Sequence, residues 1–137
     1  MIGHMSSSTA VAELQAERME AVRRFVRDHA DEPLGRARLA AVAGFSVPHF
    51  HRLWRAYTGG NVAAYVRRVR LKRAAFKLRM GAVDITEVAL YAGYDTHPAF
   101  TRAFKQQYGL SPSQFRGLDC WAATQKVHER GCDEDQA

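Results

Sequence analysis

Two arginines recur at matching places along the chain. Arg52 and Arg102 are 50 residues apart, and each stands two residues before a large aromatic side chain, Trp54 or Phe104. A guanidinium can donate two parallel hydrogen bonds to the edge of a guanine base, or hold a phosphate. The sequence contains no phosphate-binding glycine loop, no cofactor fingerprint and no convergent acid–base pair, so we expect neither an enzyme nor a cofactor. These residues predict contact with a polyanion instead.

The two arginines belong to near-copies of one pattern, at 39–66 and 88–116. Gly44 and Phe45 match Gly93 and Tyr94 at an offset of 49. At an offset of 50 the matching pairs are Pro48 and Pro98, Phe50 and Phe100, Arg52 and Arg102, Trp54 and Phe104, and Gly59 and Gly109. A solenoid needs about three or more repeats, so a period that occurs twice indicates a duplicated supersecondary unit. Each copy is predicted to be a helix, a glycine turn and a second helix.

Positive charge is concentrated in the middle of the chain. The net charge is +6, but residues 33–83 hold eleven bases and no acid, whereas 1–32 carry −2 and 119–137 carry −3. A segment without carboxylates cannot neutralise itself through helix ion pairs, so it repels itself unless an outside polyanion compensates. Nucleic acid is the partner that this pattern favours.

Composition excludes several other classes. Hydrophobic content of 47% and charged content of 25% are ordinary for a globular domain, and no apolar run is long enough to cross a membrane. Cys120 and Cys132 both lie in the C-terminal tail, which favours a reduced cytoplasmic setting. His49 and His51 are two residues apart and would point in different directions on a helix, so we expect no metal site.

The first subdomain is predicted to contain three helices. The first spans 11–29, with apolar residues at helical spacing: Leu14, Met19, Val22, Phe25 and Val26. The second spans 36–43 and ends at Gly44, which we expect in the left-handed conformation. Ser46 is predicted to cap a third helix at 47–57. Its inward face would carry Phe50, Leu53, Trp54 and Tyr57, and its outward face Pro48, His51, Arg52 and Arg55.

A basic helix at 62–80 should join the copies, with an apolar side of Tyr65, Val69, Leu71, Ala74 and Leu78. In the second copy Asp84 is predicted to accept from the amide of Glu87 in a capping box. Thr96 or Asp95 should cap a helix reaching Tyr108. Its inward residues would be Phe100, Ala103 and Phe104, and its outward residues His97, Pro98, Thr101, Arg102 and Lys105. A last short helix should hold Phe115.

We therefore expect five segments: a tag or flexible leader at 1–10, a first subdomain at 11–60, the connecting helix at 61–81, a second subdomain at 82–117, and an acidic tail or linker at 118–137. The tail is expected to be partly helical or disordered. Its charge leaves open whether it stays free, docks on the basic middle segment, or competes there with DNA.

The stretch GYDTHPAFTRAFKQQYGLSPSQFR at 93–116 resembles the signature of the AraC/XylS family of bacterial transcription regulators. IleThrGluValAla at 85–89 and ArgLeuLysArgAla at 70–74 extend the resemblance, which covers roughly residues 19–117. The resemblance implies an all-α fold of two helix-turn-helix subdomains joined by a long connecting helix. It also implies a sequence-specific regulator that inserts two recognition helices into successive major-groove segments of double-stranded DNA. An activator of this family would also contact RNA polymerase.

The resemblance assigns roles to the outward residues. The base-reading positions of the family fall on Pro48, His51 and Arg52 in the first copy, and on His97, Pro98, Thr101 and Arg102 in the second. Four further residues are better placed for phosphate, namely Ser46, Arg55, Thr96 and Lys105.

The sequence departs from the family pattern in three ways. Gly35 and Arg36 stand where a Ser or Thr cap and an apolar residue are usual, which predicts a weak first turn in the second helix. Pro98 and Ala99 occupy positions that are often polar, so the second recognition helix should contribute less to sequence discrimination. The usual sensing and dimerisation domain is not among these residues. The chain is similar in architecture to the short, monomeric MarA, SoxS and Rob group, and equally to the DNA-binding part of a longer regulator.

Two other functions remain open at this point. A basic helical protein-interaction module would bind an acidic partner, and its binding would survive saturating competitor DNA. A membrane-surface or calmodulin-type role for the basic helix is disfavoured, because its apolar side is narrow and is needed for packing. For a DNA-binding regulator we expect a monomer in the cytoplasm, associated with the nucleoid.

Overall fold

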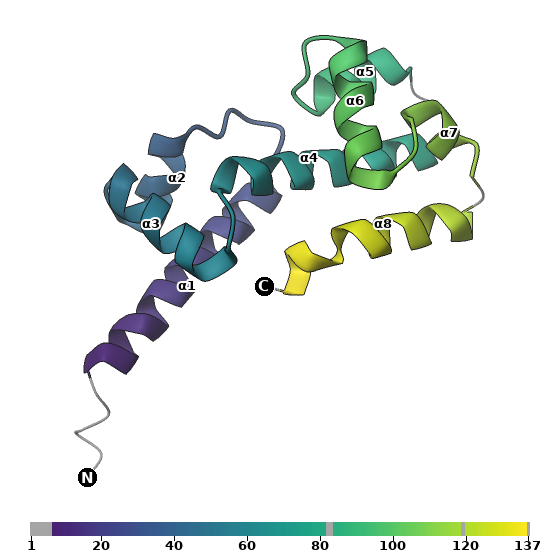
Figure 1. Ribbon diagram of the computed structural model, residues 1–137. Coiled ribbons are helices and arrows are strands. Elements are labelled where there is room, and N and C mark those ends of the chain that lie inside the picture. Colours follow the sequence, from purple (N-terminus) through teal and green to yellow (C-terminus); the bar gives the residue numbers. More distant parts are fainter. Residues whose placement is uncertain (1–6, 82–83, 119, 137) are drawn as a thin grey trace. The chain divides into compact units, whose positions relative to one another are not determined.

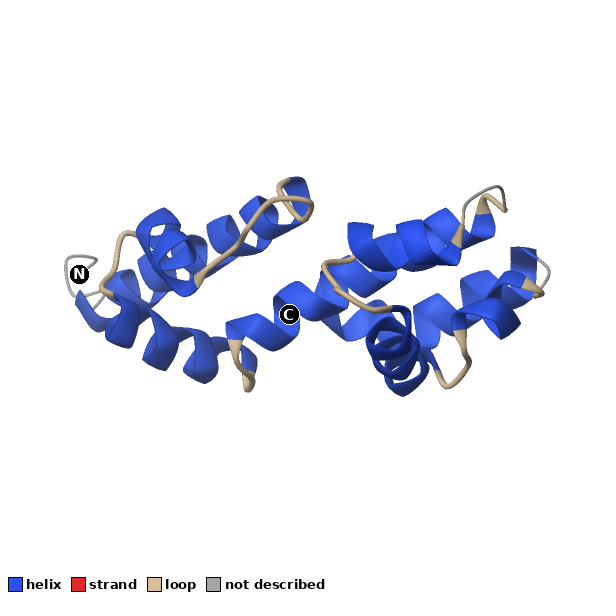
Figure 2. Cartoon of the chain, turned by 90° about the horizontal axis from the view of Figure 1, so that it is seen from above, coloured by secondary structure: helices blue, strands red, loops and turns tan. Residues whose placement is uncertain are grey.

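The computed structural model describes residues 7–81, 84–118 and 120–136, and within them every element is a helix (Figure 1). The helices are α1 (Ser7–Asp28), α2 (Arg36–Ala43), α3 (Val47–Thr58), α4 (Val62–Arg79), α5 (Ile85–Tyr91), α6 (His97–Tyr108), α7 (Pro112–Arg116) and α8 (Cys120–Gln136). Short loops join them, and none of the described residues forms a strand (Figure 2). The predicted all-α class is therefore confirmed. The chain divides into two compact units, Met1–Val66 and Arg67–Ala137, and the boundary falls inside α4.

The first unit packs α1 against α2 and α3. Its core holds the predicted apolar stripe of α1 together with the inner faces of α2, α3 and the start of α4. The fully buried side chains are Met19, Val22, Val26, Leu39, Phe50, Trp54 and Tyr65. Trp54 lies at the centre of the aromatic contacts, with ring centroids 5.9 Å from Phe50 and 5.5 Å from Tyr65. This core holds α3 in place from one side only, so its other face stays outward.

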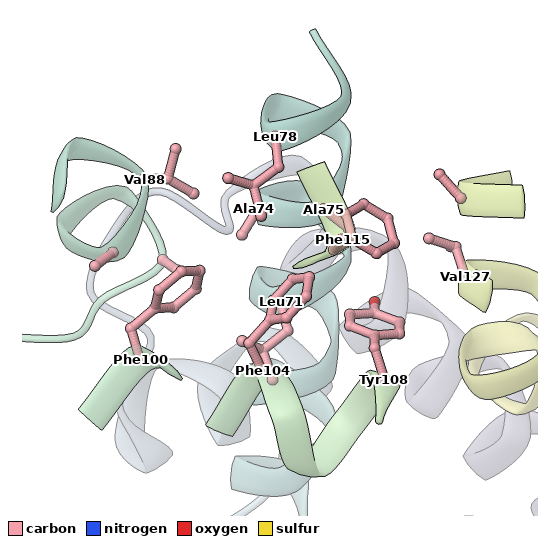
Figure 3. Close-up of a cluster of buried hydrophobic side chains, with 13 residues drawn as sticks. Leu71, Ala74, Ala75, Leu78, Val88, Phe100, Phe104, Tyr108, Phe115 and Val127 are labelled. Atoms are coloured by element: carbon pink, nitrogen blue, oxygen red, sulfur yellow. The ribbon is translucent and has the colours of Figure 1, made fainter. Parts of the chain in front are cut away.

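The second unit buries the inner faces of α4, α5, α6 and α7 around a column of aromatic rings (Figure 3). The Phe104 centroid lies 5.6 Å from that of Phe100, 4.8 Å from that of Tyr108 and 5.3 Å from that of Phe115. These rings face Leu71 and other small or aliphatic residues of α4 in the same view (Figure 3). The helix predicted to be a connector therefore also supplies one wall of the second core.

Most of the tail forms helix α8 (Cys120–Gln136), so of the two states expected for the tail, helical or disordered, the helical one is found there. Ala123 and Val127 of α8 are buried in the second core, and α8 packs against α6. Trp121, in contrast, is 70% exposed. The unit therefore extends beyond 117, the boundary expected for the second subdomain.

Both glycine turns have the predicted geometry. Gly44 has φ +78° and Gly93 φ +90°. Each turn is closed by a hydrogen bond from the residue after the glycine to a carbonyl five residues back. Phe45 N donates to Ala40 O and Tyr94 N to Ala89 O, both at 3.0 Å. These bonds satisfy carbonyls that would otherwise be left without partners at the helix ends.

Three predictions about local structure were wrong in detail. α1 begins at Ser7, four residues before the predicted start, so the end of the expected leader is helical. Leu14 is 48% exposed rather than buried. Asp84 does cap α5, but its carboxylate accepts from the amide of Thr86 at 3.2 Å instead of that of Glu87. A fourth expectation agrees with the structure, since Gly35 stands at the N-cap of α2 and provides no side-chain cap.

Candidate nucleic-acid interface

α3 presents a polar, cationic face opposite its buried aromatic face. Ser46, Pro48, Arg52 and Arg55 are all exposed, while Phe50 and Trp54 are 0% and 1% exposed. The Ser46 hydroxyl caps the helix by accepting from His49 N at 3.4 Å. The O–H of that hydroxyl can still donate to an oxygen outside the protein, because a hydroxyl has one donor besides its acceptor lone pairs. The cap and the phosphate contact predicted for Ser46 are therefore compatible.

Two residues of α3 lie differently from their predicted places. His51 is only half-buried, but its Nε2 is shielded from solvent and has no hydrogen-bond partner. In this conformation, His51 can contact a group outside the protein only through ring atoms other than Nε2. Tyr57, expected in the core, is 36% exposed, and its hydroxyl donates to Glu20 Oε2 at 2.8 Å. Tyr57 therefore ties α3 to α1 at the surface.

α6 repeats the arrangement in the second unit. Its inner residues Phe100 and Phe104 are both 0% exposed. The predicted contact residues lie on the other side, where Thr101 is half-buried and the exposed ones are Thr96, His97, Pro98, Arg102 and Lys105. Thr96 Oγ1 caps the helix by accepting from Ala99 N at 3.2 Å. The duplication thus reproduces a capped helix with a buried aromatic face and an outward arginine.

The acid-free middle segment is not wholly without ion pairs. Arg38, one of its eleven bases, pairs with Glu32 at 2.8 Å and donates to the carbonyl of Pro33 at 2.9 Å. Glu32 lies just outside the segment, so an acid from the flank neutralises part of the segment's charge. Arg52, Arg55 and Arg67 are exposed bases of the same segment.

Two tyrosines next to these surfaces hold their protons more tightly than usual. Burial raises the pKa of Tyr57 above 10.0, the hydrogen bond to Glu20 and the charge of Glu20 add to the rise, and Arg23 opposes it. Burial likewise raises the pKa of Tyr94, against the opposing positive charges of Arg67 and Arg70. Both phenols are therefore neutral across the physiological pH range.

Sequence reasoning missed two cationic residues of α1. Arg23 is 3% exposed, and its guanidinium lies 5.4 Å to 5.9 Å from the rings of Trp54, Tyr57 and Tyr65. Its Nε is 3.5 Å from Glu20 Oε2. Arg18 contacts the turn between α2 and α3. The spacing of these arginines does not distinguish them from exposed ones. A helical period identifies the apolar face of a helix, but it does not predict where a long arginine side chain at the edge of that face will reach.

Two other kinds of site are not found among the described residues. No group of three or more His, Cys, Asp or Glu side chains is placed to hold a metal ion in that part of the chain. No helix among the same residues is both long enough and apolar enough to span a membrane.

A duplicated helix-turn-helix whose second helices carry outward arginines is the architecture of a DNA-binding protein. A family model described as a helix-turn-helix domain matches residues 39–117. With the relatives below, this match shows that the chain belongs to the AraC/XylS family of bacterial transcription regulators.

Two curated relatives illustrate the match. The chain is 37% identical over 99 residues to the transcriptional regulator Rob of Salmonella typhimurium, covering 72% of this chain and 34% of Rob. It is 32% identical over 92 residues to the regulatory protein SoxS of Escherichia coli, covering 67% of this chain and 86% of SoxS. The chain thus spans about a third of the first relative and most of the second.

A solved structure agrees with this membership. The DNA-binding domain of AdpA, described as a global transcriptional factor and solved in complex with a target DNA, is 26% identical with a TM-score of 0.65. The match covers 88% of this chain and 98% of that domain.

Proposed function

We propose that this chain binds double-stranded DNA in a sequence-specific manner and regulates transcription, as an activator, by inserting α3 and α6 into successive major-groove segments. The observation that carries the proposal is the placement of Arg52 and Arg102. Both are exposed on helices whose opposite faces bury large aromatic side chains, so each helix offers its polar face to a partner without disturbing the core. A major groove about 12 Å wide admits one such helix.

The outward residues divide by the kind of contact they would make. Base edges would be read by Pro48, His51, Arg52, His97, Pro98, Thr101 and Arg102. Phosphates would be held by Ser46, Arg55, Thr96 and Lys105, which fix the register without reading the sequence. Arg52 and Arg102 carry most of the discrimination in this scheme, because bidentate contact with guanine contributes about 1–3 kcal/mol. His51 contributes less, since its Nε2 is enclosed.

The remaining assignments extend the likeness to the short, monomeric group of the family. The chain would act as a monomer in the cytoplasm, associated with the nucleoid, and as an activator it would contact RNA polymerase. Rob and SoxS are regulators by name, which supports the regulatory role. The DNA-bound AdpA domain supports double-stranded DNA as the partner.

Selection from a random duplex pool tests the proposal directly. The enriched site is then titrated beside a scrambled duplex at two salt concentrations. We expect two short boxes about one helical turn apart, and a preference for the selected site that persists at the higher salt. Binding that yields no motif and collapses with salt would contradict the proposal. It would favour the basic protein-interaction module.

A matched pair of variants on α3 separates base reading from phosphate contact. Arg52→Ala should weaken the selected site by roughly 1–3 kcal/mol and leave scrambled DNA almost unaffected. Arg55→Ala removes the same side chain from the same helix, and should weaken both duplexes alike while reducing the salt slope by about one. Equal losses on both duplexes for Arg52→Ala would reassign Arg52 to phosphate.

A further inference from the structure

In the first unit, one guanidinium touches both sides of the turn between α2 and α3. Arg18 of α1 donates from Nη1 to the carbonyl of Ala43, the last residue of α2, at 3.2 Å. Its Cζ also lies 5.0 Å from the ring centroid of Phe45, one residue before the cap of α3. A cation is favoured at a helix C-terminus, where carbonyls lack partners and the helix dipole is negative. Arg18 therefore ties the end of one helix to the beginning of the next.

Gly44 leaves the space that this guanidinium occupies. A Cβ built on Gly44 would lie 2.7 Å from Arg18 Nη1, closer than real Cβ atoms approach a neighbour. The backbone of Gly44 has φ +78°, which already disfavours a side chain. Glycine is therefore favoured at position 44 for two reasons: it adopts the left-handed conformation of the turn, and it leaves space for the guanidinium of Arg18.

The second unit places an arginine at the corresponding glycine. A Cβ built on Gly93 would lie 3.2 Å from Nη1 of Arg70 and 3.7 Å from its Cδ and Cζ. Arg70 comes from α4, whereas Arg18 comes from α1. In both units the contact therefore comes from the helix that precedes the helix-turn-helix.

The register of α1 and α4 makes these arginines equivalent. At an offset of 52 residues Arg18 matches Arg70, and the buried residues of the two helices match as well: Met19 and Leu71, Val22 and Ala74, and Val26 and Leu78. The same position on the first helix of each unit therefore bears a guanidinium that reaches the glycine turn. The duplication includes this contact, although neither arginine lies within the repeated pattern at 39–66 and 88–116.

We propose that Arg18 and Arg70 are positioning residues, each holding one turn so that the recognition helix behind it keeps the orientation needed to read bases. This inference rests on the proposed function. Hydrogen bonds to base edges require a geometry held within about 0.5 Å, whereas attraction to phosphate is tolerant of small rotations. A loosened turn therefore lowers discrimination between sequences more than it lowers affinity for DNA in general.

The test compares Arg18→Met and Arg70→Met with Arg24→Met. Arg24 is an exposed residue of α1, so its variant removes the same charge without touching the turn. Each variant is first checked for a cooperative thermal unfolding transition. For those that show one, the ratio of affinities for the selected and scrambled sites is measured at two salt concentrations. We expect this ratio of affinities to fall about tenfold for the two turn variants. A tenfold fall corresponds to about the free energy of one hydrogen bond to a charged group. The ratio should be unchanged for Arg24→Met. For Arg18→Met the loss should map to the box read by α3, and for Arg70→Met to the box read by α6.

A second measurement needs no DNA. The amide of Phe45 donates to Ala40 across the first turn, so its hydrogen exchange reports how firmly that turn is held. It should exchange faster in Arg18→Met than in wild type or Arg24→Met. Unchanged exchange together with an unchanged ratio would overturn the proposal. Equal weakening of both duplexes with a salt slope lower by about one would also overturn it, because Arg18 would then be a phosphate contact. If wild-type protein shows no preferred site, the proposed function fails, and the exchange rates still decide whether Arg18 holds the turn.

Discussion

Replacing Phe104 by alanine should be among the most destabilising single changes in the second unit. The side chain is 0% exposed and its ring packs on those of Phe100, Tyr108 and Phe115. Truncation of a buried phenylalanine costs about 3–5 kcal/mol through lost burial and the cavity left behind. A unit of this size, Arg67–Ala137, is expected to be stable by roughly 4–10 kcal/mol. The substitution should therefore remove about half of that stability.

Urea denaturation followed by far-ultraviolet circular dichroism measures this loss. Phe76→Ala is the matched control, since Phe76 lies in the same unit but is 48% exposed, and its loss should stay below about 1 kcal/mol. If Phe104→Ala leaves too little folded protein to titrate, Phe104→Leu should show a smaller loss in the same direction. Similar losses for Phe104→Ala and Phe76→Ala would refute the reasoning that the inner face of α6 holds the unit together.

Three further predictions concern caps, turns and pH. Ser46→Ala should cost about 1 kcal/mol of unfolding free energy by removing the cap of α3, measured by the same urea titration. Gly44→Ala should cost more than Gly59→Ala, because both glycines have positive φ but a Cβ at Gly44 would push the Arg18 guanidinium out of its contact with the turn, whereas a Cβ at Gly59 meets nothing within 4 Å; equal costs would mean that the contact of Arg18 adds nothing to stability. The contribution of Tyr57 and Tyr94 to stability should be constant up to about pH 10 and be lost as pH rises further, because folding raises the pKa of both phenols and so favours their neutral forms. Replacing both tyrosines by phenylalanine should reduce the loss of stability above about pH 10. An unchanged dependence of stability on pH would argue against this role of the two tyrosines.

Much of the helical framework could be predicted because its signals are local. The bounds of α2 agree with the prediction, and those of α3 differ by one residue. Ser46 and Thr96 cap their helices as expected. Such caps depend on a side chain and an amide three residues away, so the sequence contains both partners.

The errors arose where distant segments meet. Leu14 and Tyr57 fit the apolar period of their helices, yet the core does not extend far enough to bury them. Tyr57 instead reaches Glu20, which is 37 residues away in the chain. His51 was placed on the outward face by its spacing, but its neighbours enclose Nε2. Periodicity predicts the direction in which a side chain points, but it does not predict whether other helices cover that side chain.

The sequence by itself determined the duplicated helix-turn-helix, the two left-handed glycines, the helix caps and the outward arginines Arg52 and Arg102, because each depends on residue type and short-range spacing. Only the tertiary structure decided that α4 forms a wall of the second core, that α8 packs on it, and that Arg18 and Arg70 reach equivalent turns. Those contacts join side chains of separate helices, and they form only when the burial of apolar surface brings the helices together.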